Sequence, residues 1–475
     1  MPRTAIVIGA GLAGLLAAAA LFPAYDEVLV LDRDELPDGP EHRRGLPQGR
    51  HAHLLMPGGL EAMEALLPPA AIRERLLSAG AHEISLGAGM VVLSTEGWFH
   101  RWRKDGQLMI TCSRALLDWV VREALLATAN NIRFLKGQAL ELIGDAQKIS
   151  GIRIDTGSGP TDLDADFVVD ASGRGSRIVK WLATLGITGI EERTVDSGLV
   201  NATRIYRTPP PAENFPLTMV QANPYQSLPG RSAVIVPIED SRWMVSLAGT
   251  RGGEPPASPD GFLQYTLDLP HPIVGQLISG AEPLTDVVVS RSTSNARRYL
   301  EKARQWPDRL VVLGDALATF NPAYGQGMSV AALGAQVLGR EARRNALHVP
   351  GAARTIQRAA ARSVEAAWTL AVSQDVLYPE VRGGAPTLVD HLAARYTRRL
   401  TKAATGSYAA ASALWTVTGL KAGPTHLLRP ASLLHAITGP SLPALSAPPL
   451  TPRERQIMSA LDRTSGGANP TPRPV

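Results

Sequence analysis

Residues 5–32 read AIVIGAGLAGLLAAAALFPAYDEVLVLD. Two short aliphatic runs, 5–8 and 28–31, flank a glycine turn and a stretch of small residues, which predicts strand, turn, helix and strand. A βαβ unit of this kind implies a parallel sheet, because the crossover helix returns the chain to the same end of the next strand. The stretch therefore predicts an α/β fold.

Three glycines in this turn, Gly9, Gly11 and Gly14, have the spacing of a dinucleotide-binding fingerprint. The first makes a tight turn, the second lets a pyrophosphate approach the backbone, and the third lets helix and strand pack closely. Asp32 ends the second run 18 residues after Gly14, where a carboxylate can accept ribose hydroxyls. The second strand also argues against a secretory signal peptide in the apolar stretch after Arg3.

The composition excludes several classes of protein. A chain of 475 residues with 45% hydrophobic and 19% charged residues is globular, with roughly two to three domains. The net charge of +5, without a long run of Lys or Arg, gives little support to nucleic-acid binding. The single Cys112 excludes an intramolecular disulfide and fits a reducing compartment. The histidines lack the spacing of a metal site and no segment is long enough to span a membrane, so we expect a cytoplasmic protein without a metal.

A second candidate site lies far along the chain, where residues 313–328 read LGDALATFNPAYGQGM. This is a strand end, an acid and a Gly/Pro turn that opens a helix. Asp315 can accept a ribose or ribityl hydroxyl, and amides around 325–328 can stabilise negative charge on a reduced isoalloxazine. Two nucleotide-facing loops at opposite ends of one chain predict a long cofactor, FAD, lying across the sheet.

Three motifs follow one another: GAGLAG at 9–14, VVDASGRGSR at 168–177, and the segment 313–328. In this order they resemble the FAD-dependent monooxygenases of the aromatic-hydroxylase and squalene-epoxidase type. The closer resemblance is to flavin epoxidases of polyether-antibiotic biosynthesis, of the monensin and lasalocid type. It is carried further by GLPQGRHAH at 45–53 and GWFHR at 97–101.

The resemblance spans most of residues 4–335 and implies the fold class. We expect a Rossmann-like FAD-binding domain of the glutathione-reductase type, an inserted β-sheet substrate domain and a C-terminal helical region. The expected domains are residues 1–75, 110–185 and 295–346 for FAD binding, 76–109 and 186–294 for the β-rich substrate domain, 347–440 for the helices, and 441–475 for a loosely ordered Pro-rich tail.

The motifs and the resemblance together predict the cofactor site. Arg114 matches a family arginine that opens a helix beside the cofactor phosphates, although a solvated helix arginine is the alternative. Arg44 and Gln48 lie in a flexible loop and either contact a mobile flavin or face solvent. The predicted cofactor-binding residues are Gly9, Gly11, Gly14, Asp32, Arg33, Arg44, Gln48, Arg114, Ala139, Asp315, Pro322, Gly325, Gln326, Gly327 and Met328.

The resemblance implies epoxidation: a flavin C4a-hydroperoxide, formed with O2, transfers oxygen to double bonds of a lipophilic polyene of polyketide type, free or carrier-bound. Core packing is the alternative fate of each aromatic residue that we select for the pocket, and a structural role is the alternative for each histidine that could place a proton. The pocket candidates are Trp98, Trp102, Trp243, Phe320 and Tyr324; the histidines are His51, His53 and His100.

Other functions stay open at this point. Ala318 stands where aromatic hydroxylases usually have His, which weakens but keeps the alternative of hydroxylating a polyketide-derived phenol; Asp32 replaces their commoner Glu. The segment from Trp98 to Trp102 lacks the Trp-x-Trp-x-Ile-Pro signature of flavin halogenases. A flavin reductase of prenyl chains and a non-enzymatic flavin sensor are further alternatives. No second glycine fingerprint marks an NAD(P)H site, so the reductant is NAD(P)H used directly or through a separate reductase.

Overall fold

The computed structural model describes residues 2–103, 106–291, 294–344 and 346–464. Its first layer is a five-stranded sheet in which every pairing is parallel. The central strand β1 (Thr4–Ile8) lies between β2 (Glu27–Asp32) and β12 (Phe167–Asp170), and the edges are β8 (Ile132–Lys136) and β20 (Leu310–Val312). The strands are short aliphatic runs because most of their residues are buried, as in a parallel sheet that is covered on both faces.

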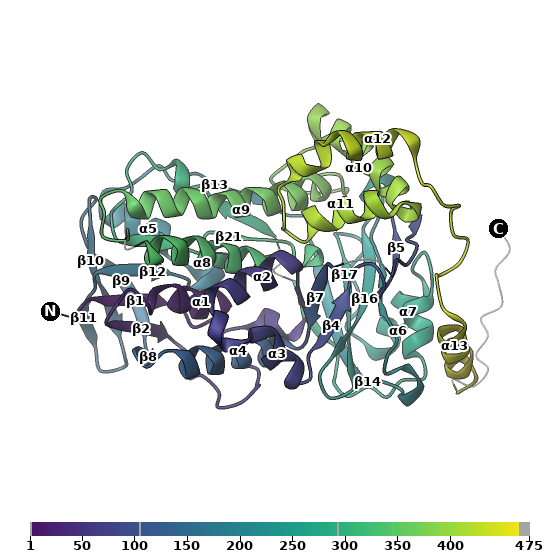
Figure 1. Cartoon of the computed structure of the whole chain (residues 1–475), viewed down its shortest axis with the longest axis horizontal. Helices are drawn as coiled ribbons and strands as arrows, with labels where there is room; N and C mark the ends of the chain where they lie inside the picture. The colour runs from purple at the N-terminus through teal and green to yellow at the C-terminus, as the bar shows by residue number, and fades with distance from the viewer. Residues whose placement is uncertain (1, 104–105, 292–293, 345, 465–475) are drawn as a thin grey trace.

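Four helices pack together beside this sheet. Helix α1 (Leu12–Leu21) has an alanine-rich, almost fully buried surface, which allows close approach of α8 (Gly327–Arg343) and α4 (Arg114–Thr128). Helix α9 (Ala352–Asp375) packs on α8 and extends the stack away from the sheet (Figure 1). The predicted strand-turn-helix-strand opening is confirmed, and a helix begins at Arg114, as the resemblance implied.

The second large layer is a seven-stranded sheet, shown at the right of Figure 1. Segment 90–98, early in the chain, adds its strands to those of residues 200–290. The parallel pairing in this sheet is that of β5 (Met90–Ser94) with β15 (Leu217–Val220). In spatial order the strands are β18 (Val288–Ser290), β14 (Val200–Arg207), β17 (Arg242–Gly249), β16 (Arg231–Ile238), β15 (Leu217–Val220), β5 (Met90–Ser94) and β6 (Gly97–Trp98).

One face of this sheet carries a hydrophobic core with Trp243 and Phe262 at its centre. Helices α6 (Pro259–Leu267) and α7 (Ile273–Ile278) pack there. Only a β-rich domain was expected in this region. Both helices contain residues that are typical of breaks between strands, namely Pro259 and Gly261 in α6 and Gly275 in α7.

Smaller sheets and short helices complete the part of the chain up to the C-terminal helices. Three three-stranded sheets lie between or beside them. Their strands are β3 (Leu54–Leu55), β7 (Leu108–Thr111) and β4 (His82–Ser85); β11 (Pro160–Asp164), β10 (Ile149–Asp155) and β9 (Gln138–Gly144); and β13 (Glu192–Val195), β19 (Asn295–Arg298) and β21 (Ala318–Thr319). The remaining short helices here are α2 (Pro57–Leu66), α3 (Ile72–Ser78) and α5 (Ile178–Thr184).

The C-terminal helices α10 (Leu388–Gly406), α11 (Tyr408–Thr418) and α12 (Pro430–Thr438) enclose a small core of their own. The chain then crosses to the seven-stranded sheet, where the described residues end with α13 (Pro452–Thr464), as Figure 1 shows. The expectation of a loosely ordered tail from 441 is thus wrong as far as 464. Two apolar side chains of α13, Ile457 and Leu461, join the core of the sheet. The last part of that predicted tail, 465–475, lies outside the described residues.

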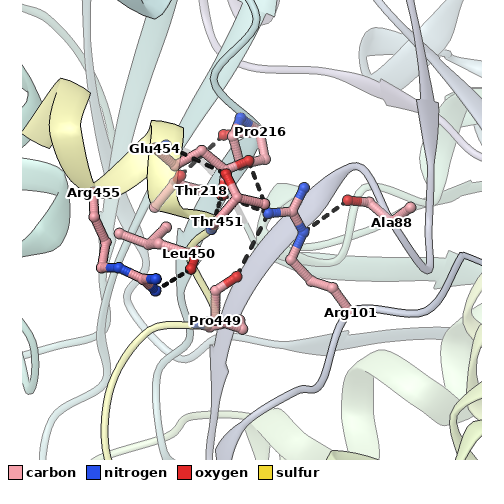
Figure 2. Close-up of polar contacts among 9 residues, drawn as sticks. All are labelled: Ala88, Arg101, Pro216, Thr218, Pro449, Leu450, Thr451, Glu454 and Arg455. Atoms are coloured by element: carbon pink, nitrogen blue, oxygen red, sulfur yellow. Dashed lines mark hydrogen bonds and ion pairs between the residues drawn. The ribbon is translucent and has the colours of Figure 1, made fainter.

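Polar contacts also fix this segment (Figure 2). Arg101 Nη1 donates to both carboxylate oxygens of Glu454, at 2.8 and 2.7 Å. Arg101 Nε also donates to the carbonyl of Ala88 at 2.8 Å.

Within the described residues, no helix combines the length and the apolar character that a membrane span requires.

Candidate functional site

Loops that follow four parallel strands meet at one edge of the first sheet. Because the strands are parallel, their carboxyl ends lie on the same side, where ligands of open α/β sheets bind. The loops after β1, β2, β12 and β20 all contribute to one cavity of ≈ 570 Å³. The glycine fingerprint and the second predicted site, far apart in the sequence, therefore belong to one wall.

The glycine turn has the conformation that its sequence predicts. Gly9 has φ +101°, and a Cβ there would lie 2.5 Å from the carbonyl oxygen of Ala171. A Cβ on Gly14 would lie 1.7 Å from the carbonyl oxygen of Gly9, so this position fixes the packing of helix on strand. At Gly11 the nearest atom is the Arg43 guanidinium, 3.5 Å away. Gly11 therefore borders open cavity space while Gly14 is a packing residue.

Asp32 is held at the end of β2 by three contacts. Its Oδ2 accepts a hydrogen bond from the amide of Ala10 at 2.6 Å and pairs with Arg43 at 3.1 Å, while Oδ1 accepts from the amide of Asp34 at 2.9 Å. Arg43 lines the cavity, whereas the neighbouring Arg44 is exposed and does not. Arg43, paired with Asp32, thus lines the cavity, while Arg44 has the position of the solvent-facing alternative; its contact with a mobile flavin stays a prediction.

Asp315 lies at the opposite end of the cavity, beside the first turn of α8. A Cβ on Gly327 would lie 4.0 Å from Asp315 Oδ1. Burial raises the pKa of the Asp315 carboxyl, while the positive charges of Arg114 and Arg174 lower it. The carbonyl oxygen of the Gln326 side chain is buried and has no hydrogen-bond partner among the described residues.

The loop before α8 is fixed from the C-terminal side of the chain. Asp375, the last residue of α9, accepts hydrogen bonds from the Tyr324 hydroxyl at 2.7 Å and from the Asn321 and Asn295 amides at 3.0 and 2.7 Å. Asp375 is 1% exposed, and its burial raises the pKa of the carboxyl. This network holds the loop that carries Phe320 against the cavity.

Two histidines line the cavity where it approaches the seven-stranded sheet. Burial lowers the pKa of His51 to about 4 and that of His53, beside Arg114, to about 3. His53 Nδ1 donates to the carbonyl of His51 at 2.7 Å. Both rings are therefore neutral at physiological pH.

Most of the predicted cofactor-binding residues line the cavity. The exceptions are Gly14, which packs behind the turn, and Arg44. The predicted residues in the wall are Gly9, Gly11, Asp32, Arg33, Gln48, Arg114, Ala139, Asp315, Pro322, Gly325, Gln326, Gly327 and Met328.

Of the predicted substrate-binding residues, only Phe320 lines this cavity. Trp98 and Trp243 lie in the core of the seven-stranded sheet, with 5% and 1% of their surface exposed. Tyr324 donates to Asp375 rather than facing the cavity, and Trp102 packs against Tyr408 with ring centroids 5.9 Å apart. The core-packing alternative thus describes Trp98 and Trp243, whereas Trp102 and Tyr324 contact Tyr408 and Asp375 without lining the cavity.

Sequence reasoning missed several residues of the wall. Arg174 and Arg177 follow β12 in a loop that was recognised as a motif but given no role. Asn201 and Ser290 come from the seven-stranded sheet. The strand pattern around 200 could have indicated which residues share a face, but not that this face meets a distant loop. Across the described part of the chain, no group of three or more His, Cys, Asp or Glu residues could hold a metal ion.

Comparison with known proteins identifies the family. A family model described as an FAD binding domain matches residues 3–342. The chain belongs to this FAD-binding family. The Mycobacterium tuberculosis (strain ATCC 25618 / H37Rv) protein Rv3254 is 30% identical over 390 residues, which cover 79% of this chain and 80% of that protein.

Solved structures share the fold of this flavoprotein. The flavin-dependent brominase Bmp2 aligns with a TM-score of 0.64 at 14% identity, covering 91% of this chain and 98% of that one. PqsL, a probable FAD-dependent monooxygenase from Pseudomonas aeruginosa, aligns with a TM-score of 0.55 at 17% identity, covering 79% and 97%. At these identities the likeness establishes the α/β architecture of the FAD-binding fold.

The residues of the cavity fit FAD. Gly11 leaves room for a pyrophosphate, and Asp32 stands where ribose hydroxyls would need an acceptor. At the other end, the first amides of α8 and the unpartnered Gln326 side chain suit the polar edge of an isoalloxazine.

Proposed function

We propose that this flavoprotein is a monooxygenase that epoxidises carbon-carbon double bonds of a lipophilic polyene of polyketide type. The observation that carries the proposal is the chemistry of the cavity wall between the two sheets. The histidines there, His51 and His53, are held neutral with depressed pKa values. Such weak bases are poorly suited to ionising a phenol, whereas oxygen transfer to an alkene needs no base.

Bound FAD would supply the redox chemistry, namely activation of O2 by its reduced form. The residues of this chain would bind and orient the cofactor and keep water out. Asp32 and the glycine turn would hold the adenosine end, and Asp315 with the first turn of α8 the flavin end. Phe320, 9% exposed in the cavity wall, would provide an apolar surface beside the reacting centre.

The test is mass spectrometry of products formed under ¹⁸O₂ by the FAD-loaded, reduced enzyme with a panel of polyenes and a panel of phenols. We expect one labelled oxygen in an epoxide. Efficient hydroxylation of a phenol with every polyene untouched would contradict the proposal and favour the second candidate, aromatic hydroxylation. A polar pair in the wall, Asn201 and His51, favours that candidate because it could hold a phenol oxygen.

The reductant is part of the same proposal. We propose NAD(P)H, used directly or through a separate flavin reductase. Anaerobic bleaching of the bound flavin by NADH or NADPH alone would indicate direct use. Bleaching only after addition of a flavin reductase would indicate a partner.

A further inference from the structure

Two buried side chains of the cavity wall lack a hydrogen-bond partner. Asn201 on β14 is 5% exposed and His51 is 6% exposed. Asn201 Nδ2 and His51 Nε2 are both buried without a partner among the described residues, and both side chains line the cavity. A buried polar group that is left unpaired destabilises the protein, so each such group calls for an explanation.

A chain of hydrogen bonds sets the protonation of His51. Ser246 Oγ accepts from the amide of Ala52 at 3.0 Å, Thr203 Oγ1 lies 2.6 Å from Ser246 Oγ, and His51 Nδ1 lies 2.9 Å from Thr203 Oγ1. One direction gives each hydroxyl proton an acceptor: Ser246 donates to Thr203, and Thr203 donates to Nδ1. A neutral imidazole that accepts at Nδ1 carries its proton at Nε2.

Asn201 lies beside Thr203, the residue that contacts His51. Asn201 and Thr203 are two residues apart on β14, so their side chains leave the same face of the sheet. Thr203 contacts His51, which places His51 and Asn201 on that face together. Ser290, the strand partner of Asn201 on β18, also lines the cavity. The seven-stranded sheet thus contributes polar side chains to the cavity wall, whereas Phe320 contributes an apolar one.

We propose that Asn201 and His51 together bind a hydrogen-bond-accepting oxygen of the substrate, a carbonyl or a phenolic oxygen. This inference rests on the proposed function, because it deepens the description of the same cavity. It assigns Asn201 and His51 as specificity-determining residues and Thr203 and Ser246 as positioning residues. The substrate would be a polyene or aromatic compound that carries oxygen, and a pure hydrocarbon would bind poorly. A site built to hydrogen-bond a ligand oxygen discriminates strongly against an analogue that lacks it.

The experiment measures binding without turnover. Three probes of similar shape are titrated into the oxidised, FAD-loaded enzyme, and the flavin absorption difference spectrum gives each dissociation constant. The probes are 2-acetylnaphthalene, 2-naphthol and 2-ethylnaphthalene. We expect the acetyl or the hydroxyl probe to bind at least ~10-fold more tightly than the ethyl probe, as for a buried hydrogen bond. The probe that is preferred identifies carbonyl or phenol as the source of the oxygen.

Variants then locate the effect. Asn201→Leu and Thr203→Val should each reduce the preference for the oxygen-bearing probe to near one. Thr218→Val is the matched control, because Thr218 is a buried threonine of the same sheet that bonds to the carbonyl of Pro216 and does not line the cavity. If Thr203→Val does not fold, Ser246→Ala interrupts the same chain at its next member.

Three results would overturn the inference. The first is the absence of a preference for either oxygen-bearing probe in the unmodified enzyme, and the second is a preference that survives Asn201→Leu. The third is weakened FAD retention in Asn201→Leu without any probe, which would assign the donors to the cofactor. Failure of the enzyme to oxidise any polyene would count against the proposed function and leave this binding result unaffected.

Discussion

Asp32 and its ion pair with Arg43 form the adenosine end of the cavity. The carboxylate also accepts the amide of Ala10, so it connects the second strand to the glycine turn. We predict that Asp32→Ala weakens FAD retention, because each charge-assisted hydrogen bond to a ribose hydroxyl contributes about 1.5–3 kcal/mol. Equilibrium dialysis against flavin measures this, with the exposed Asp38→Ala as control. Full FAD occupancy of the variant at sub-micromolar flavin would count against the role.

Asp315 illustrates a conflict between stability and function. Burial raises its pKa above 3.8, so the folded protein disfavours the ionised carboxylate. The ionised group therefore lowers the free energy of unfolding, and this loss grows as pH rises. We predict that Asp315→Asn raises the melting temperature of the FAD-free protein at neutral pH, by an amount that vanishes in acid. The same variant should lose about 10²-fold in turnover through misplacement of the flavin. Unchanged turnover in the folded variant would contradict this role.

His53 predicts a second pH effect. Its pKa falls from 6.5 in the unfolded chain to about 3 in the folded protein. As the pH falls, the unfolded chain therefore takes up a proton at His53 before the folded protein does. The stability that the neutral ring provides is present above pH 6.5 and is lost as the pH falls below that value. We expect His53→Gln to flatten the fall in melting temperature between neutral and mildly acidic pH. Parallel pH profiles for the variant and the unmodified protein would rule out this contribution.

In the glycine turn, Gly14 and Gly11 have different roles: Gly14 fixes the packing of helix on strand, and Gly11 borders the open cavity. Gly14→Ala would place a Cβ 1.7 Å from the Gly9 oxygen, while Gly11→Ala meets only the tip of Arg43 at 3.5 Å. We predict that Gly14→Ala lowers the melting temperature of the FAD-free protein. Gly11→Ala should leave it nearly unchanged but abolish tight FAD binding. Gly39→Ala, with nothing within 4 Å of its Cβ, is the control; equal melting temperatures for all three would refute the packing role of Gly14.

The sequence predicted the site best where a chemical motif stands directly after a strand of the parallel sheet. Two nucleotide-facing loops predicted one long cofactor, and the turn after β1 and the acid after β20 do line one cavity, because carboxyl ends of parallel strands meet at the same edge. The sequence did not predict that Arg43, rather than Arg44, lines the cavity, and it left the burial of Trp243 undecided. The first depends on an ion pair, and the second on which face of an antiparallel sheet is covered by helices. Tertiary packing decides both.

The same limit applies to the polar pair in the cavity wall. Asn201 lies in the region that was expected to be β-rich, and His51 in the loop motif at 45–53. Their proximity results from the packing of the loop at 47–53 against β14 and β17, through contacts with Thr203 and Ser246. A single sequence contains no signal for such long-range pairing. Residues of this kind have to be found through their unpartnered atoms in the structure.

At the scale of the whole molecule, the cavity lies where three parts of the chain converge. The parallel sheet provides the cofactor anchors, the seven-stranded sheet provides Asn201 and Ser290, and α9 fixes the loop before α8 through Asp375. The segment from 441 to α13 connects the C-terminal helices to the seven-stranded sheet. Its start is held by a hydrogen bond from the amide of Leu442 to the carbonyl of Gly406 at 3.0 Å. The C-terminal segment therefore joins regions that are distant in the sequence.

The ion pair between Arg101 and Glu454 should be the polar anchor of that connection. Glu454 also caps α13, accepting from the amide of Thr451 at 2.7 Å, and the side chains of Arg101 and Glu454 are 20% and 11% exposed. We predict that Glu454→Ala lowers the free energy of unfolding by about 1–3 kcal/mol, because it leaves a largely buried guanidinium without its carboxylate. Urea denaturation measures the change, with the exposed Arg453→Ala on the same helix as control.

A double-mutant cycle decides whether this loss comes from the contact itself. Once Arg101→Ala has removed the guanidinium, Glu454→Ala should cost only its capping interaction, so the double variant should be more stable than the sum of the single losses predicts. Strictly additive losses would mean that the two side chains do not stabilise each other. In that case apolar packing, with Ile457 and Leu461 as its most buried members in α13, would hold the helix on the sheet. Leu461→Ala, which removes a side chain that is 5% exposed, should then cost far more than Glu454→Ala, toward the ~2–5 kcal/mol of a core leucine.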